Sequence, residues 1–469
     1  MDEIWRWNTQ ATAHHIREGS VSSSEVAQAH LDRLDEVNPI INAVTNDVRD
    51  DALETARALD QSMVANGPVG PLHGVPITIK ENIDVAGQVT PNGMVALADL
   101  VAPDDSPLVA HFKRAGAVII GRTNTPEMSY RWHTDNPLRG ETRNPWSAKR
   151  TAGGSSGGAA AAVVAGIGTI AHGNDLGGSV RQPANCCGVA GIRTSLGRVP
   201  AFNHSAVGDR VLALQLMSVQ GPLGREVDDV RRALDIMVQP SDLDPWHRVG
   251  PPSGDPAVGR IAATYGLGHT DAEVRQAVDS AAEYLETAGY DVEFVDPPDL
   301  DEIRTGWRSI LATEVGVTVD LDSIDGLSED LIHTVGWMFD GAAVDLAGLV
   351  TAYARRHTIL RRWTRFVAQR GLILCPVSQI VPFAPNDDAS GQARFNEILD
   401  GHTCLVAANY LGLPGAAVPV SITDDGPIGV QLIGAPFADY ECLDAAAAIE
   451  AGAGVMAERL WAGFESSLI

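Results

Sequence analysis

The stretch from Arg143 to Pro200 constrains this chain most, because glycine, serine and alanine fill it where larger side chains would hold backbones apart. Its first block, residues 153–158, reads GGSSGG and runs into an alanine-rich segment. Its second block, residues 177–179, reads GGS and follows Asp175. In such loops, successive backbone N–H groups can converge on a developing negative charge beside a serine hydroxyl. The stretch therefore predicts an active site built on serine.

Two other motifs fit the same stretch. Residues 154–158 match G-x-S-x-G, the nucleophile elbow, with Ser156 as nucleophile, but that motif needs an apolar strand before it and the preceding residues are rich in turns. Residues 166–171 match a degenerate dinucleotide fingerprint, yet they end an alanine-rich segment instead of opening a helix after a strand. Either small-residue block alone would also suit a flexible or helix-capping loop. Together, with a lysine upstream, they favour a functional site.

The upstream lysine is Lys80, at the end of an alternating run from Gly74 that predicts a strand. A buried lysine is costly unless it is paired or neutral, and the alternative is that Lys80 simply faces solvent. Helices are predicted over residues 9–18, 22–37 and 106–115, with Thr9 and a serine among residues 22–24 as N-caps and Gly19 as a stop. A short buried strand is predicted over 117–121, and residues 123–144 form a long irregular connection.

The charge balance argues against some partners. The chain carries 60 Asp and Glu against 34 Lys and Arg, for a formal charge of −26, and the acidic residues are scattered. Such a surface repels phosphate backbones and anionic lipids, so we expect no nucleic acid and no membrane as partners. An ordinary soluble surface explains the charge equally well.

Neither a metal site nor a secretion signal is predicted. The five cysteines lack zinc-like spacing, and the adjacent His14 and His15 point about 100° apart on a helix, which suits joint ligation poorly. The N-terminus has no apolar signal core, and the small apolar run 159–171 is shorter than a membrane helix requires. A cytoplasmic protein with reduced cysteines is expected.

These motifs closely resemble the amidase signature family of serine hydrolases. The resemblance rests on the GGSSGG block, on DLGGSVR where the family usually has DTGGSIR, on the 24-residue separation of Ser155 and Ser179, and on Lys80 within GVPITIKENIDV. It extends to TRNPW before the motif, VQGPLGREVDDVRRALDIM after it, and NYLGLPGAAVPV and GPIGVQLIGAPFADYECLDAAAAIE near the C-terminus. Only residues 250–370 are unfamiliar.

The resemblance implies roles for individual residues. Lys80, Ser155 with a cis peptide bond, and the nucleophile Ser179 would form the proton chain. The oxyanion hole would be made by backbone N–H groups, those of Leu176, Gly177, Gly178 and Ser179. Three further side chains would orient the loop, namely Ser156, Asp175 and Arg181, although a surface cation is the alternative for Arg181. The sequence departs from the family at Leu176, where threonine is common, and at residues 192–195, where LKPT is usual.

The resemblance also implies a fold and an activity. The fold would be one compact α/β domain over residues 1–469, with a mixed central sheet surrounded by helices. Its catalytic core would span about 70–235 and 370–455, and residues 250–370 would shape the substrate pocket. Four candidates for the pocket wall, which could equally be core, are Trp307, Trp337, Met338 and Phe339.

The implied reaction is hydrolysis of a small-molecule amide to an acid and ammonia or an amine, through an acyl-enzyme on Ser179, without cofactor or metal. The alternative is the catalytic subunit of a tRNA-dependent glutamine amidotransferase, which usually continues differently from residues 200–205 of this chain. An inactive binding protein on this scaffold would be expected to have lost a member of the proton chain, and all three are present. The oligomeric state stays open, although family members are often homodimers.

Overall fold

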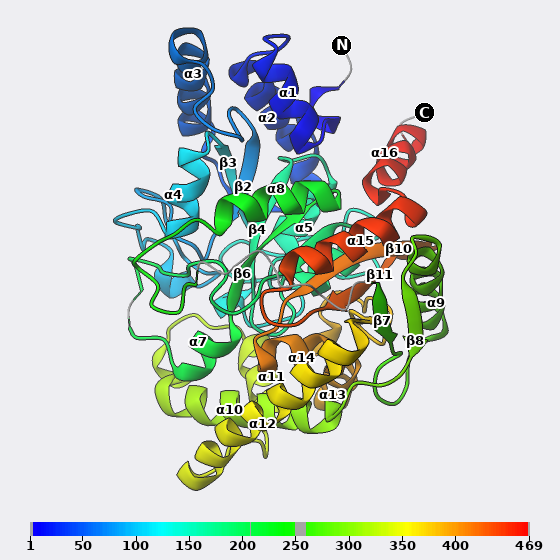
Figure 1. Ribbon diagram of the computed structural model, residues 1–469. Helices are drawn as coiled ribbons and strands as arrows, with labels where there is room; N and C mark the ends of the chain where they lie inside the picture. Colours follow the sequence, from blue (N-terminus) through cyan, green and yellow to red (C-terminus); the bar gives the residue numbers. More distant parts are fainter. Residues whose placement is uncertain (1–2, 207, 249–258, 468–469) are drawn as a thin grey trace.

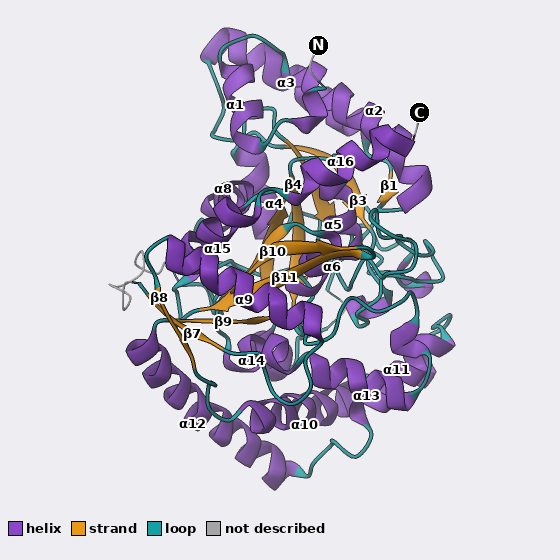
Figure 2. Ribbon diagram, turned by 90° about the vertical axis from the view of Figure 1, so that its right-hand side faces the viewer, coloured by secondary structure: helices purple, strands orange, loops and turns teal. Residues whose placement is uncertain are grey.

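A mixed sheet of eleven strands runs through the part of the chain that the structure describes, residues 3–206, 208–248 and 259–467 of a computed structural model (Figures 1 and 2). In spatial order the strands are β1 (Val44–Asn46), β3 (Val118–Thr123), β2 (Pro76–Lys80), β4 (Ile170–Asp175), β6 (Val219–Gly224), β5 (Ala190–Arg193), β10 (Gly415–Thr423), β11 (Gly426–Ile433), β9 (Leu372–Pro376), β7 (Arg260–Ala263) and β8 (Asp291–Phe294). Residues 250–258 of the predicted variable region lie outside the described residues.

The strands β2, β3 and β4 bring the two halves of the predicted site together. Strand β2 lies between β3 and β4 and runs parallel to both, with Ile77 opposite Ile170. Because parallel strands end at the same edge of a sheet, Lys80 at the end of β2 comes beside the end of β4. Every residue of β2 is buried, as expected for a strand covered by helices on both faces.

Alternate strand residues belong to two different apolar clusters, one on each face of the sheet. One face is covered by α4 (Pro107–Arg114), α8 (Val227–Met237), α9 (Ala272–Thr287) and α15 (Asp439–Ala453). The other is covered by α2 (Ser23–Ile41), α3 (Arg49–Asn66), α5 (Gly157–Val164), α6 (Arg181–Cys187) and α16 (Met456–Ser467). The predicted α/β class, a mixed sheet surrounded by helices in one domain, is confirmed.

A third group of helices packs together at the end of the molecule opposite the N-terminal helices, at the bottom of Figures 1 and 2. It comprises α7 (Leu212–Met217), α10 (Leu300–Thr318), α11 (Glu329–Phe339), α12 (Leu346–Arg370), α13 (Gln392–Gly401) and α14 (Thr403–Leu411). Single helical turns are η1 (Ile4–Arg6), η2 (Val95–Leu97), η3 (Glu127–Ser129), η4 (Leu321–Ser323) and η5 (Asp387–Ala389). Helices α10, α11 and α12 lie within residues 250–370, so much of the unfamiliar region belongs to this group.

The predicted N-terminal helices are present with two corrections. Helix α1 (Thr9–Arg17) is capped by Asn8, whose side chain accepts a hydrogen bond from the Ala11 N–H. The prediction of Thr9 as the cap was wrong. Thr9 is the first residue of the helix, and its N–H donates to the Asp229 carboxylate. Helix α2 begins at the predicted serine cap, Ser22, in a capping box. It continues beyond the predicted end to Ile41, which is buried in the core.

Close backbone approach explains the small residues of α5. Every residue of this helix is buried, and a Cβ on Gly158 would lie 2.5 Å from the Asn124 nitrogen and 2.7 Å from the Ala43 oxygen. All five cysteines are buried and carry free thiols. In the described ranges, no helix combines the length and the apolar character needed to cross a membrane.

Candidate active site

Lys80 ends β2 with its side chain completely buried against the small-residue loop. Its Nζ lies 2.6 Å from the Ser155 Oγ, 2.8 Å from the Asn174 Oδ1 and 3.1 Å from the Ser156 Oγ. All three contacts are within hydrogen-bonding distance. The alternative that Lys80 faces solvent is therefore wrong.

Burial decides the ionisation of this lysine. Removal from water lowers the pKa of Lys80 well below its usual value, and the negative charges of Asp175 and Glu81 only partly oppose that shift. A lowered pKa makes the neutral amine available at moderate pH. A neutral amine can accept a proton, which is the property required of a general base.

Ser155 follows a cis peptide bond from Gly154, as the resemblance implied. The preceding glycines let this turn fit between two segments of backbone. A Cβ on Gly154 would lie 2.4 Å from the Arg131 carbonyl oxygen, and Gly153 adopts a φ of +83° with the Pro183 Cα only 2.6 Å from a Cβ there. A larger residue at either position would force this turn or the neighbouring backbone to shift.

Ser156 joins the two serine loops. Its N–H donates to the Ser179 carbonyl oxygen at 3.2 Å, and its hydroxyl oxygen accepts a hydrogen bond from the Lys80 Nζ. Ser179 is 8% exposed, whereas Ser155 is 1% exposed, so a substrate can reach Ser179 more readily. The Ser179 hydroxyl makes no hydrogen bond to another described residue, which leaves it available to a bound ligand.

Asp175 and Arg181 form a completely buried ion pair beneath the loop. Burial alone would raise the pKa of Asp175, but Arg181 and Arg193 hold it well below its ordinary value. The Arg181 guanidinium donates to five oxygens, on Asp175, Leu405, Gln431 and Asn409. The surface alternative for Arg181 is therefore wrong, and its contacts connect this loop to α14 and β11.

Arg193 falls in the segment where this chain departs from the family pattern. It is completely buried, and its Nη1 donates to the backbone oxygens of Asp175 at 2.6 Å and Met217 at 2.8 Å. Burial lowers the pKa of Arg193 to about 9. Arg193 therefore stands where the family usually has lysine, and its guanidinium supports the end of β4.

The candidate oxyanion N–H groups are not equivalent. The Gly178 N–H donates to the Asp175 carboxylate at 2.8 Å, whereas those of Leu176, Gly177 and Ser179 donate to no described residue. Gly178 adopts a φ of +97°, and a Cβ there would lie 2.2 Å from the Leu405 side chain. Only glycine suits that position, and three N–H groups of the loop are directly available to an oxyanion.

Two tryptophan side chains contact the backbone oxygens of the loop that contains Leu176 and Gly177. The Trp132 Nε1 donates to the Gly177 oxygen at 2.9 Å, and the Trp307 Nε1 lies 3.4 Å from the Leu176 oxygen. The predicted wall residues Trp307, Trp337, Met338 and Phe339 all belong to the apolar cluster that includes Leu176. The same cluster contains further aromatic residues that sequence reasoning missed, among them Tyr130, Trp132 and Phe395.

Two further site residues, Asn174 and Asn409, were not predicted, and only the first could have been suspected from the sequence. Asn174 directly precedes Asp175 in the sequence, so its nearness to the site could have been suspected from the motif alone. Asn409 is more than two hundred residues away, and its Nδ2 donates to Asp175 at 2.7 Å. Nothing in the local sequence around Asn409 indicates that contact.

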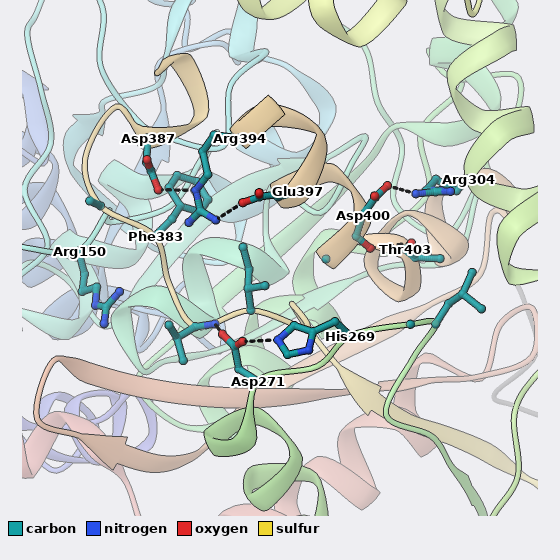
Figure 3. A pocket seen from close by; sticks show the side chains of 16 residues that line it. Arg150, His269, Asp271, Arg304, Phe383, Asp387, Arg394, Glu397, Asp400 and Thr403 are labelled. Atoms are coloured by element: carbon teal, nitrogen blue, oxygen red, sulfur yellow. Dashed lines mark hydrogen bonds and ion pairs between the residues drawn. The ribbon is translucent and has the colours of Figure 1, made fainter. Parts of the chain in front are cut away.

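A separate pocket of about 700 Å³ lies between the loop before α9, the segment around η5 and helix α13 (Figure 3). None of the predicted site residues lines it. Its charged groups pair with one another, as Arg394 does with Asp387 and Glu397. In the described part of the chain, no group of three His, Cys, Asp or Glu residues is arranged to hold a metal ion.

Comparison with known proteins identifies the family of this chain. Residues 25–443 match the family described as Amidase. The chain is 45% identical to the indoleacetamide hydrolase of Bradyrhizobium diazoefficiens, over 98% of this chain and 88% of that protein. Among solved structures, 6-aminohexanoate cyclic dimer hydrolase superposes with a TM-score of 0.81 at 26% identity, over 97% of this chain and 98% of that chain.

The chain belongs to the amidase signature family. It is a hydrolase that acts on the amide C–N bonds of small molecules. The glutamyl-tRNA(Gln) amidotransferase of Symbiobacterium thermophilum has a related subunit that is more distant, at 31% identity over 91% of this chain and 93% of that protein. The small-molecule interpretation is therefore favoured over the amidotransferase alternative.

Proposed function

We propose that this amidase hydrolyses primary amides whose acyl group carries an aromatic ring, as in indoleacetamide, to the acid and ammonia. The observation that carries the chemistry is the 2.6 Å contact between the buried Lys80 amine and the Ser155 hydroxyl. The aromatic residues that contact the loop of Leu176 and Gly177 support an aromatic acyl group. The relative at 45% identity, an indoleacetamide hydrolase, supports the same substrate class.

In the proposed reaction, Ser179 attacks the amide carbonyl carbon as its proton passes to Ser155 and the Ser155 proton passes to Lys80. The carbonyl oxygen becomes an oxyanion held by the N–H groups of Leu176, Gly177 and Ser179, with Gly178 shared with Asp175. As the C–N bond breaks, Ser155 protonates the leaving nitrogen and recovers a proton from Lys80. Ammonia leaves, and an ester between the acyl group and Ser179 remains.

Water then completes the cycle. It attacks the ester carbonyl while giving a proton to Lys80 through Ser155, and the same N–H groups hold the second oxyanion. Collapse of this intermediate returns the proton to the Ser179 oxygen and releases the acid. Ser156, Asp175 and Arg181 would act by positioning, since each contacts the loop or Lys80.

The division of labour along the chain is also part of the proposal. The catalytic core, about residues 70–235 and 370–455, supplies Lys80, both serines and the partners of Arg181. The region of about 250–370 supplies Trp307, Trp337, Met338 and Phe339 to the acyl pocket. We further propose that the enzyme works in the cytoplasm without nucleic acid, consistent with its charge of −26, and that it forms a homodimer.

A substrate panel tests the acyl group. Ammonia release from indoleacetamide and phenylacetamide should exceed that from aliphatic amides of similar size by roughly 2–10-fold in kcat/KM, since contacts between aromatic rings contribute about 0.5–1.5 kcal/mol beyond the area they bury. Equal or faster turnover of the aliphatic amides would overturn the assignment.

A matched pair of tryptophan variants locates the pocket. Trp307→Leu should lower kcat/KM for the aromatic amides more than for the aliphatic ones. Trp246→Leu, which changes a tryptophan that is 38% exposed, should affect neither. Equal losses on both substrate types in Trp307→Leu would mean that this residue is only core.

A further inference from the structure

The three hydrogen-bond partners of Lys80 differ in what they can do. Ser155 and Ser156 contribute hydroxyls, which can donate or accept a hydrogen bond. Asn174 contributes its amide oxygen, Oδ1, at 2.8 Å, and an amide oxygen can only accept. Asn174 therefore always requires an N–H from Lys80.

This requirement limits where the lysine lone pair can lie. A protonated lysine has three N–H groups and can donate to all three partners. When it loses one proton, the N–H that faces Asn174 has to remain, because that partner cannot donate. The lone pair is then confined to the directions of the two serines, and the shorter contact, at 2.6 Å, is with Ser155.

The side chain of Asn174 has no other partner in the described chain. Its residue lies in β4, between the parallel strand β2 and the antiparallel strand β6, where it is opposite Gln220. Gln220 instead hydrogen-bonds His172. Since the side-chain amide of Asn174 hydrogen-bonds Lys80 alone among the described residues, this side chain contributes little to holding the sheet together.

Other charged groups near Lys80 do not duplicate this contact. Asp175 is occupied by Arg181, Asn409 and the loop N–H groups. Glu81 accepts from the Gly93 N–H and the Thr45 hydroxyl, and Arg139 lies 3.8 Å from it. Burial lowers the pKa of His172 to about 3, so that ring stays neutral at moderate pH.

We propose that Asn174 is a positioning residue that aims the Lys80 lone pair at the Ser155 hydroxyl. This inference rests on the proposed function, in which Lys80 is the base. It predicts that two different substitutions of Asn174 shift the pKa of Lys80 in opposite directions.

In Asn174→Asp, a carboxylate replaces the amide oxygen at 2.8 Å and favours the charged lysine. The rise of kcat/KM with pH should then move to higher pH by roughly 1–3 units. In Asn174→Leu, the charged lysine loses an acceptor, so the rise should move to lower pH. Its plateau should fall roughly 10–100-fold, because the lone pair is no longer aimed. Shifts in the same direction, or losses without any shift, would show a merely structural role.

Direct titration of Lys80 distinguishes a failure of the proposed function from a failure of the inference about Asn174. The chain has only three lysines, Lys80, Lys113 and Lys149, so ¹³C-labelled lysine gives few NMR signals, which Lys113→Met and Lys149→Met assign. The Lys80 pKa is then measured in a Ser179→Ala background, which needs no turnover. Asn38→Asp makes the same amide-to-acid change in α2, where the side chain contacts Ala43 and Val44, and should leave the Lys80 pKa unchanged.

If the wild-type rate does not follow the measured pKa of Lys80, the proposed function fails. If it does follow, but both Asn174 variants keep the wild-type pKa and plateau, only the inference about Asn174 is refuted. Opposite shifts in both the NMR titration and the pH–rate profile would establish it.

Discussion

Replacing Lys80 by methionine removes the proposed base while preserving the volume of a side chain that is completely buried. The fold should survive, because methionine fills the apolar path of the lysine stem. General base catalysis contributes about 10²–10⁴-fold, so kcat/KM for an aromatic amide should fall by that factor. At 1.36 kcal/mol for each tenfold change, this loss corresponds to about 3–5 kcal/mol of transition-state stabilisation.

The pH dependence gives the sign of the effect. Burial lowers the pKa of Lys80, and only the neutral amine can accept a proton. The wild-type rate should therefore rise with pH through that lowered pKa and then level off. Lys80→Met should lose this rise along with most of its activity.

The leaving group gives a second readout. An amide nitrogen needs a proton through Ser155 before it can leave, whereas a nitrophenolate does not. Acylation by a nitrophenyl ester of the same acid should therefore lose at least about tenfold less than amide hydrolysis. The assay follows ammonia and nitrophenolate release across pH for the wild type and the variant.

A surface lysine provides the control. Lys113 is 41% exposed and pairs with Asp105, so Lys113→Met should change neither substrate's rate nor the pH profile. The reasoning would be refuted if Lys80→Met showed small, equal losses on both substrates with an unchanged profile. Lys80 would then be a bystander, and a histidine-based mechanism would have to be considered.

Two further predictions concern the serine loop, and a third concerns metal ions. Ser179→Ala should lower amide turnover by about 10⁴-fold or more with an unchanged circular dichroism spectrum, and retained activity would exclude Ser179 as the nucleophile. Gly178→Ala should lower the free energy of unfolding, measured in urea, by about 2–5 kcal/mol, because alanine is strained at a φ of +97° and its Cβ clashes with Leu405. Unfolding at the wild-type midpoint would contradict this. In the double variant, Leu405→Ala should recover the part of the loss that comes from the clash. EDTA should leave the rate unchanged because Lys80 and the loop N–H groups supply the chemistry, and a loss restored by one particular metal would refute that view.

Short-range features of this protein could be read from its sequence. The spacing of the GGSSGG and GGS blocks indicated the family, because small residues and positive φ values are local requirements of those turns. Strand β2 was predicted to end at Lys80, and helix α2 to begin near Ser22, since strand alternation and capping depend on neighbouring residues. The cap of α1 was missed by one residue because Thr9 is engaged by Asp229, far away in the chain.

Which side chains meet was decided only by the tertiary structure. Asn174 reaches Lys80 because β2 and β4 are parallel neighbours, although 94 residues separate the two side chains in sequence. Asp175 occupies the Gly178 N–H that the motif assigned to the oxyanion hole, and Asn409 joins the same carboxylate from α14. A local pattern specifies backbone shape, whereas hydrogen-bond partners and burial depend on segments that come together only when the sheet forms. The lowered pKa of Lys80 has the same origin, because it arises from burial.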